Sequence, residues 1–201
     1  MKTLVIVDMQ QDFYSPNGSL YVKGGEKIIP NIIKYITEHK DEIADVVFTL
    51  DWHPNYPSAF VDEQVDWPRH CVQYTTGAGV SDEILNTCVD NQKITKFFIK
   101  GNNVPHTEYG AFAKIGRYET FYGEQKIAVN NINGDSSLTF ETNNIVVCGI
   151  AGDYCVLETL KNLVNSKICD SIELLENGVV SIDGTNEKIK NYCLLKNVNI
   201  I

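Results

Sequence analysis

Two hydrophobic patterns alternate along this chain, and together they predict a layered α/β fold. Short runs of consecutive apolar residues are typical of strands buried on both faces of a parallel sheet. Segments with an apolar residue at every third or fourth position predict amphipathic helices. The strands are expected at residues 3–7, 44–50, 93–99, 145–149, 171–175 and 198–201, and the helices at 26–39, 81–86, 153–164 and 186–196.

This alternation predicts a doubly wound, mostly parallel sheet of about six strands with helices on both faces. We expect one domain over residues 1–201, because the pattern contains no linker and no internal repeat. Asn177-Gly178, just after the fifth strand, predicts a turn. The strand at 145 requires a crossover connection through residues 114–144, where the pattern predicts no clear element.

Reactive residue types stand where four of the predicted strands end. Asp8 follows the first strand, Asp51 the second and Lys100 the third. The fourth runs into a glycine-bearing turn, and Cys155 then falls in the first turn of a helix. Because the carboxyl ends of parallel strands share one edge of the sheet, where α/β proteins bind ligands, these side chains should converge.

A thiol, an acid and a lysine at one edge can carry out amide hydrolysis. The positive end of a helix dipole lowers the pKa of a thiol such as Cys155, and a carboxylate can take its proton. Backbone N–H groups around Ala151 and Cys155 can hold an oxyanion, and the protonated acid can return its proton to a leaving amine. Cys155 by itself could also be a buried structural cysteine, so the prediction depends on the whole group.

The Pro- and aromatic-rich loop after Asp51 carries residues that bind metals. Asp51 and His53 are two residues apart, so on an extended chain they point to the same side and can share one cation. His70 is a third candidate ligand. A fourth could come from Asp62, Glu63 or Asp66. Mixed histidine and carboxylate ligands suit zinc, manganese or iron.

Composition narrows the class of partner and the cellular location. The 201 residues are 43% hydrophobic and 21% charged, with a formal net charge of -9. This charge argues against nucleic acid or an anionic membrane as the main partner. Asp8 interrupts the first apolar run, and no run approaches the length of about 20 residues that a membrane span needs. With six cysteines and no C-x-x-C pair, free thiols and a soluble cytoplasmic protein are expected; whether it forms a homo-oligomer stays open.

Five motifs occur in order between residue 1 and about residue 165: I-V-D-M-Q-Q-D-F, D-W-H-P, W-P-R-H-C, K-G at 100–101 and G-I-A-G-D-Y-C-V. In these motifs the chain resembles the nicotinamidase/pyrazinamidase branch of the isochorismatase-like cysteine hydrolase superfamily. The resemblance implies an isochorismatase-like fold. It also implies a metal-dependent amidohydrolase that converts nicotinamide to nicotinate and ammonia through a cysteine thioester, as part of NAD salvage.

The resemblance also implies roles for individual residues. It assigns a catalytic triad to Asp8, Lys100 and Cys155, and it implies a cis peptide bond between Ile150 and Ala151 that helps to aim the oxyanion donors. Phe13 and Trp67 are similar to the aromatic residues that sandwich the pyridine ring. Tyr109 and Tyr154 are expected near the same pocket.

For the metal, the resemblance implies one divalent transition-metal ion that fixes the pyridine nitrogen, with zinc as the first choice and iron or manganese as alternatives. Asp51, His53 and His70 are the implied ligands. Many members carry a histidine where this chain has Pro57. We therefore expect Glu63 to take that place, with Asp62 as the alternative.

Two other functions compete with this interpretation. The chain could be an amidohydrolase of the same superfamily for another small amide or carbamoyl substrate, although such relatives commonly lack the Asp-x-His loop. It could also be a non-catalytic protein that binds a small molecule or a metal. The intact set of Asp8, Lys100 and Cys155 argues against that second alternative.

Overall fold

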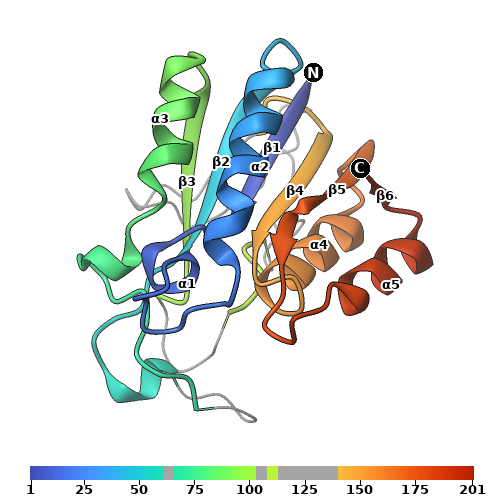
Figure 1. Cartoon of the computed structure of the whole chain (residues 1–201). Coiled ribbons are helices and arrows are strands. Elements are labelled where there is room, and N and C mark those ends of the chain that lie inside the picture. The colour runs from blue at the N-terminus through green and yellow to red at the C-terminus, as the bar shows by residue number, and fades with distance from the viewer. Residues whose placement is uncertain (61–65, 103–107, 113–139) are drawn as a thin grey trace, which may run out of the picture.

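A six-stranded parallel sheet forms the centre of the protein (Figure 1). The computed structural model describes residues 1–60, 66–102, 108–112 and 140–201. The strand order is β3-β2-β1-β4-β5-β6, so the order reverses between β1 and β4. The strands are β1 (Lys2–Val7), β2 (Ile43–Asp51), β3 (Ile94–Lys100), β4 (Asn144–Ile150), β5 (Ser171–Val180) and β6 (Asn199–Ile200).

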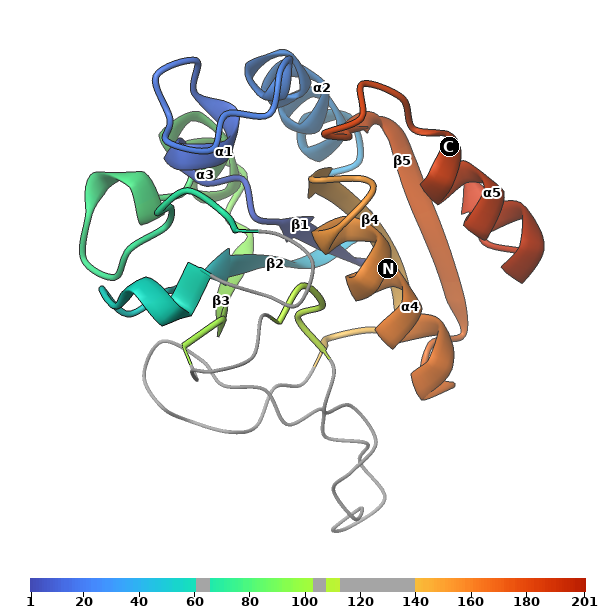
Figure 2. The same ribbon diagram turned by 90° about the horizontal axis from the view of Figure 1, so that it is seen from below.

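Helices cover both faces of this sheet, as the sequence predicts. Figure 2 shows α2 and α3 on one face and α4 on the other, with α5 beside α4. The described helices are α1 (Gln11–Tyr14), α2 (Gly25–Glu38), α3 (Asp82–Asp90), α4 (Cys155–Ser166) and α5 (Glu187–Lys196), with short 3-10 turns at Pro57–Phe60 and Thr76–Ala78. None of these helices is both long enough and apolar enough to cross a membrane.

The helix α3 is longer than its sequence pattern predicts. Its start is fixed by Ser81, whose hydroxyl accepts a hydrogen bond from the N–H of Ile84 at 3.5 Å. The helix then continues beyond the expected end at residue 86 to Asp90. Cys88, in this added turn, is fully buried, so tertiary packing extends the helix past the point that local pattern indicates.

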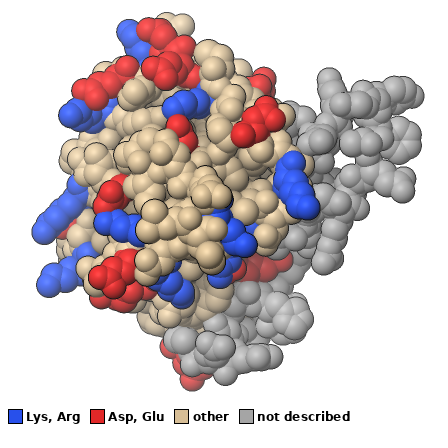
Figure 3. All heavy atoms as spheres, turned by 90° about the vertical axis from the view of Figure 1, so that its right-hand side faces the viewer, with Lys and Arg blue, Asp and Glu red and all other residues tan. Residues whose placement is uncertain are grey.

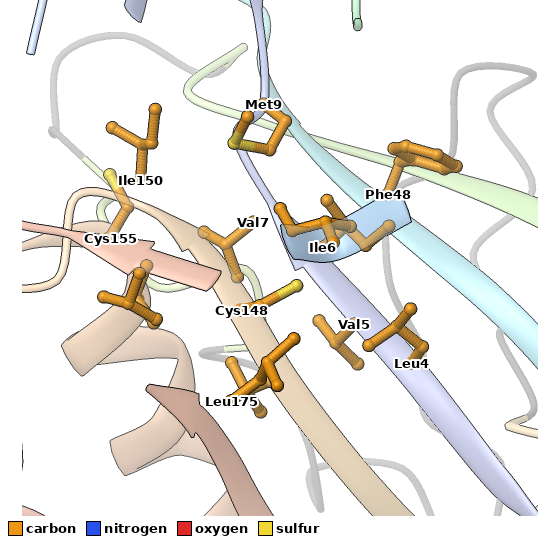
Figure 4. Packing of buried hydrophobic residues seen from close by; sticks show 14 of the residues in the cluster. Leu4, Val5, Ile6, Val7, Met9, Phe48, Cys148, Ile150, Cys155 and Leu175 are labelled. Atoms are coloured by element: carbon orange, nitrogen blue, oxygen red, sulfur yellow. The ribbon is translucent and has the colours of Figure 1, made fainter. Parts of the chain in front are cut away.

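The core is densest around β1, which lies between β2 and β4. Side chains from Leu4 to Val7 have no exposed surface. Ile6 is paired with Phe48 of β2 and with Cys148 of β4, and Figure 4 shows these neighbours packed side by side. Apolar packing on both faces makes the end of β1 a rigid support for the residues that follow it.

The predicted turn at Asn177-Gly178 is wrong, because β5 continues through it to Val180. The register with β4 shifts here: Val147 pairs with Leu174, whereas Gly149 pairs with Val179. The extra residues form a bulge, and a side chain at Gly178 would press against Leu175 and Cys148. The strand is thereby long enough for the Val180 carbonyl to accept the N–H of Gly152 at 2.9 Å.

The crossover between β3 and β4, expected in residues 114–144, falls mainly in residues 113–139, which lie outside the described residues.

On the face shown in Figure 3, basic and acidic side chains are interspersed. The reactive residues of the sequence analysis lie elsewhere, at the carboxyl edge of the sheet.

Candidate active site

The structure brings the four predicted strand-end residues together. Asp51 and Lys100 end β2 and β3 and are direct cross-strand partners. The Lys100 Nζ lies 2.8 Å from Asp8 Oδ2 and 3.5 Å from Cys155 Sγ, and it also contacts Asp51 Oδ1. The expected convergence at the carboxyl edge is therefore present, close to the point where the strand order reverses.

This group of charges is buried, and burial dominates its protonation. Asp8 is fully buried, Lys100 is 3% exposed and Cys155 is 7% exposed. Burial raises the pKa of Cys155 well above its ordinary value; Lys100 opposes this, while Asp8 adds to it. Burial also raises the pKa of Asp8, against the pull of Lys100. Burial acts to lower the pKa of Lys100, but Asp51 and Asp8 outweigh it and raise that pKa well above normal.

The net pKa shift of Cys155 in this structure is upward, whereas the sequence predicts a lowered pKa at a helix terminus. Cys155 does begin α4, as predicted. Removal of the thiol from water disfavours its charged form more strongly than Lys100 favours it. The thiol is neutral at neutral pH in this state, so a nearby base is needed to activate it.

Asp8 is held in a geometry that leaves one carboxylate oxygen available. Its φ of 48° lies in the left-handed region, which a non-glycine residue adopts at a cost of roughly 1–3 kcal/mol when its surroundings enforce it. Thr49 donates its hydroxyl to Asp8 Oδ1 at 2.6 Å. Apart from the Lys100 ion pair, Oδ2 accepts no hydrogen bond from the described residues. An oxygen of Asp8 lies within 4.8 Å of Cys155 Sγ.

The turn before α4 holds the two predicted oxyanion donors. The peptide bond between Ile150 and Ala151 is cis, as the resemblance implies. Tyr154 and Val156 donate their N–H groups to the Ala151 carbonyl at 3.1 and 3.0 Å. No backbone bond among the described residues uses the N–H of Ala151 or of Cys155. Both groups therefore remain available beside the thiol.

Asp51, His53 and His70 form a compact group of potential metal ligands. Their donor atoms all lie within 4.8 Å of one another, and all three residues are buried. Nε2 of His53 lies 3.6 Å from Asp51 Oδ2, and Nε2 of His70 lies 3.7 Å from it. Both histidines and Lys100 outweigh the effect of burial and hold the pKa of Asp51 well below its ordinary value.

The hydrogen bonds behind these ligands suit a divalent ion. The Nδ1 of His53 lies 3.1 Å from the carbonyl of Gly101, and that of His70 lies 2.6 Å from the carbonyl of Pro68. Because a carbonyl can only accept, each Nδ1 carries a hydrogen, and Nε2 is the atom of each ring that can bind a metal ion in its unprotonated form. Two imidazoles and a carboxylate fit a divalent transition metal.

The proposed fourth ligand stays a prediction. Glu63 and its alternative Asp62 lie outside the described residues. Asp66 is exposed. Pro57, which stands where many relatives have a histidine, is exposed as well and begins a 3-10 turn that ends at Phe60.

One pocket is lined both by the thiol of Cys155 and by the ligand group of Asp51, His53 and His70. The four aromatic residues that the resemblance places at the substrate all line it: Phe13, Trp67, Tyr109 and Tyr154. Trp67 donates its indole N–H to the hydroxyl of Tyr109 at 3.0 Å, and its ring centroid lies 5.4 Å from that of Tyr154. Flat, mostly apolar walls and a few polar groups suit a small aromatic ligand.

Sequence reasoning missed some residues that contribute to the site. The Phe60 ring lies 5.2 Å from the His53 ring and 5.5 Å from the His70 ring, and it also lines the pocket. Thr49 holds Asp8, and its only signal in the sequence is that it is polar within the apolar run of β2. The contacts of both residues depend on the tertiary arrangement, which the sequence pattern does not reveal.

A buried thiol, carboxylate and lysine at the carboxyl edge of a parallel sheet are the arrangement of a cysteine hydrolase built on a layered α/β fold. The isochorismatase domain family matches residues 2–102, and a nicotinamidase/pyrazinamidase of Mycobacterium tuberculosis is 31% identical over 92% of this chain and 90% of its own length. The chain therefore belongs to the isochorismatase-like cysteine hydrolases, in the nicotinamidase/pyrazinamidase branch.

Solved structures show the same fold. A yeast nicotinamidase superposes with a TM-score of 0.75 at 24% identity and covers 100% of this chain and 99% of its own. A Pyrococcus horikoshii pyrazinamidase in complex with zinc superposes with a TM-score of 0.68 at 27% identity, covering 100% and 98%. The family match ends at residue 102, before Cys155. The similarity to the Mycobacterium tuberculosis relative, which covers 92% of this chain, extends the match into the half that carries the thiol.

Proposed function

We propose that this protein is a metal-dependent nicotinamidase that hydrolyses nicotinamide to nicotinate and ammonia through a thioester on Cys155. The observation that carries the proposal is the contact of Lys100 with both Asp8 and Cys155, together with the position of Cys155 in the lining of an aromatic pocket. The family relationship supports it, because the Mycobacterium tuberculosis relative is a nicotinamidase/pyrazinamidase.

In the first half of the reaction, Asp8 acts as the general base. Its Oδ2 takes the proton of the neutral Cys155 thiol while Sγ attacks the carboxamide carbon. The N–H groups of Ala151 and Cys155 stabilise the oxyanion, and Lys100 offsets the charge that moves between thiol and carboxylate. When the C–N bond breaks, Asp8 returns its proton to the leaving nitrogen, so that ammonia departs and the thioester remains.

In the second half, water replaces the amine. Asp8 takes a proton from the water molecule while the water oxygen attacks the thioester carbonyl carbon. The C–S bond then breaks, the proton returns to Sγ, and nicotinate leaves. The raised pKa of Asp8 serves both halves, because it makes the carboxylate a better acceptor for the proton of the thiol and of the water.

The far side of the pocket orients the ring. The family resemblance implies that Phe13 and Trp67 sandwich the pyridine ring with Tyr109 and Tyr154 nearby, and the position of all four in the pocket lining supports this. Asp51, His53 and His70 would hold one divalent ion, with Glu63 as the fourth ligand and Asp62 as its alternative. When bound, such an ion supplies a Lewis-acidic site for the pyridine nitrogen. We infer zinc, with iron or manganese as alternatives, since the Pyrococcus horikoshii pyrazinamidase was solved with zinc.

We further infer that the enzyme works in the cytoplasm, in NAD salvage, as a single domain. All six cysteines are free, which is the usual state of thiols in a reducing compartment. Nicotinate, the proposed product, is a starting point for renewed NAD synthesis.

An ammonia-release assay across a panel of small amides tests the proposal. Nicotinamide and pyrazinamide should be hydrolysed, and Cys155→Ala should abolish turnover because no thioester can form. Preferential hydrolysis of a non-aromatic amide or a carbamoyl compound would instead identify another amidohydrolase of the superfamily. Normal turnover of nicotinamide by Cys155→Ala would refute the mechanism.

A further inference from the structure

The short segment from Asp8 to Phe13 follows β1 and enters α1, and its side chains contribute to several parts of the site. Asp8 belongs to the proposed triad and Phe13 to the pocket wall. Gln10 and Asp12 lie between them, and neither has a part in the reaction described above. Both side chains instead contact the backbone of the segments that carry the metal-ligand group.

Gln10 is fully buried and binds both backbone groups of Asp51. Its Oε1 accepts the Asp51 N–H at 2.8 Å, and its Nε2 donates to the Asp51 carbonyl at 2.8 Å and to the Ala78 carbonyl at 2.9 Å. The paired stretch of β1 ends at Val7, opposite Thr49, so Asp51 lies beyond the backbone of β1. The Gln10 carboxamide takes the place of that missing strand and fixes the end of β2.

Asp12 holds the segment that carries His70. Its Oδ2 accepts the N–H of Cys71 at 2.7 Å, and its Oδ1 accepts the N–H of Ser19 at 3.1 Å. Cys71 has a φ of 45°, a left-handed conformation that needs support at a non-glycine residue. The Cys71 carbonyl in turn accepts the N–H of His53 at 3.0 Å. The Asp12 carboxylate therefore holds the segment of His70 directly, and it supports the segment of His53 through Cys71.

The space around Asp12 indicates a close fit. A side chain at Gly77 would collide with the Asp12 carboxylate. Glycine at this position thus allows the 3-10 turn at Thr76–Ala78 to pass directly over Asp12, while Ala78 in the same turn supplies a carbonyl to Gln10. The two side chains and this turn form one packed unit behind the ligand group.

We propose that Gln10 and Asp12 are positioning residues for the metal: Gln10 fixes Asp51, and Asp12 fixes the segments of His70 and His53. The inference rests on the metal site of the proposed function, but not on the identity of the amide substrate. Hydrogen-bonded residues behind metal ligands typically contribute about 10- to 100-fold to metal affinity, because they hold the ligands in binding geometry.

Zinc affinity of the metal-free protein is the decisive measurement. Zn²⁺ is titrated against a chromophoric competing chelator for the wild type, Gln10→Met and Asp12→Asn. Methionine keeps the volume of glutamine without its hydrogen bonds, and asparagine replaces one accepting oxygen of Asp12. Each variant should bind Zn²⁺ about 10- to 100-fold more weakly than the wild type. Gln11→Met and Asp82→Asn are matched controls, because the Gln11 side chain bonds only the Tyr14 hydroxyl among the described residues and Asp82 is exposed. Their affinity should be unchanged.

Thermal unfolding of the same metal-free proteins separates positioning from a general structural role. Lower stability with wild-type zinc affinity in the folded variants would overturn the proposal. If Gln10→Met does not fold, Asp12→Asn decides alone, since Asp12 is only half-buried. A wild-type protein that binds no zinc would refute the metal site itself. Equal binding by wild type and variants would refute only the positioning roles.

Discussion

Strands β2 and β3 carry two aspartate–lysine pairs, and the two pairs differ in what surrounds them. Near the amino ends, the fully buried Asp45 accepts the Thr3 hydroxyl on Oδ1 and Lys96 Nζ at 2.9 Å on Oδ2. Lys96 also binds Glu141 at 2.8 Å. Lys96 thus faces two carboxylates, and the network ties three strands and the start of the described segment 140–201 together.

At the carboxyl ends, Asp51 and Lys100 form a second aspartate–lysine pair, and the groups that surround it are different. Lys100 faces two carboxylates, those of Asp51 and Asp8, and a neutral thiol. Apart from the Lys100 ion pair, one oxygen of Asp8 accepts no hydrogen bond from the described residues. A buried aspartate–lysine pair is therefore structural where it only joins strands, and it becomes reactive where it lies beside a thiol that lines a pocket.

The largest expected contrast is between Asp8→Asn and Asp45→Asn. Asp8→Asn removes the proposed general base, so the rate of ammonia release should fall by about 10²–10⁴-fold. Its stability should change little, because burial already disfavours the charged form of Asp8. Asp45→Asn breaks a buried pair and should lower the free energy of unfolding by about 3–5 kcal/mol, with near-normal turnover of the folded protein.

Steady-state ammonia release and urea unfolding of both variants check this contrast. The wild type supplies the reference for each measurement. A folded Asp45→Asn variant with a loss of turnover as large as that of Asp8→Asn would contradict the division into a structural and a reactive pair.

The contrast also shows what could be predicted from the sequence. Asp8, Asp51 and Lys100 were predictable because each follows an apolar run, and parallel strands bring their carboxyl ends to one edge. The hydrogen bonds of Gln10 and Asp12 were not, because they join segments about 40 to 60 residues apart through side-chain geometry. The β5 bulge was missed because Asn-Gly is also a strong turn signal.

The pKa of Cys155 was mispredicted for a related reason. The sequence places the thiol at a helix terminus, which is a local feature and lowers the pKa. Its burial depends on packing against other segments of the chain and is the largest cause of the upward shift. Local signals predicted where the thiol lies, whereas the direction of its pKa shift needed the tertiary structure.

Metal removal should produce the second-largest effect. It should act on the site around Asp51 and Lys100 and leave the network around Asp45 and Lys96 unaffected. Chelation should abolish most ammonia release, and added Zn²⁺ should restore it. A ligand that binds only the folded state at 100 times its dissociation constant adds about 2.7 kcal/mol of stability, so the wild type should melt at a higher temperature with zinc than without it.

Two variants locate this stabilisation. His53→Ala should lose the zinc-dependent rise in melting temperature, because it removes one of the three described ligands. Asp45→Asn should melt lower overall but keep the full rise. An equal zinc-dependent rise in His53→Ala and in the wild type would refute the assignment of the metal to this group.

The smallest expected effect is on the pH dependence of Cys155 alkylation. Because burial raises the pKa of Cys155 well above the ordinary value of about 8.5, iodoacetamide should react slowly at pH 7 and faster as the pH rises beyond that value. The Asp8 carboxylate also raises this pKa, so Asp8→Asn should shift the alkylation profile to lower pH while hydrolysis is lost. Asp45→Asn should leave the profile unchanged. Peptide mass spectrometry measures the rate at Cys155, and a shift to higher pH in Asp8→Asn would show that Asp8 does not act on the thiol.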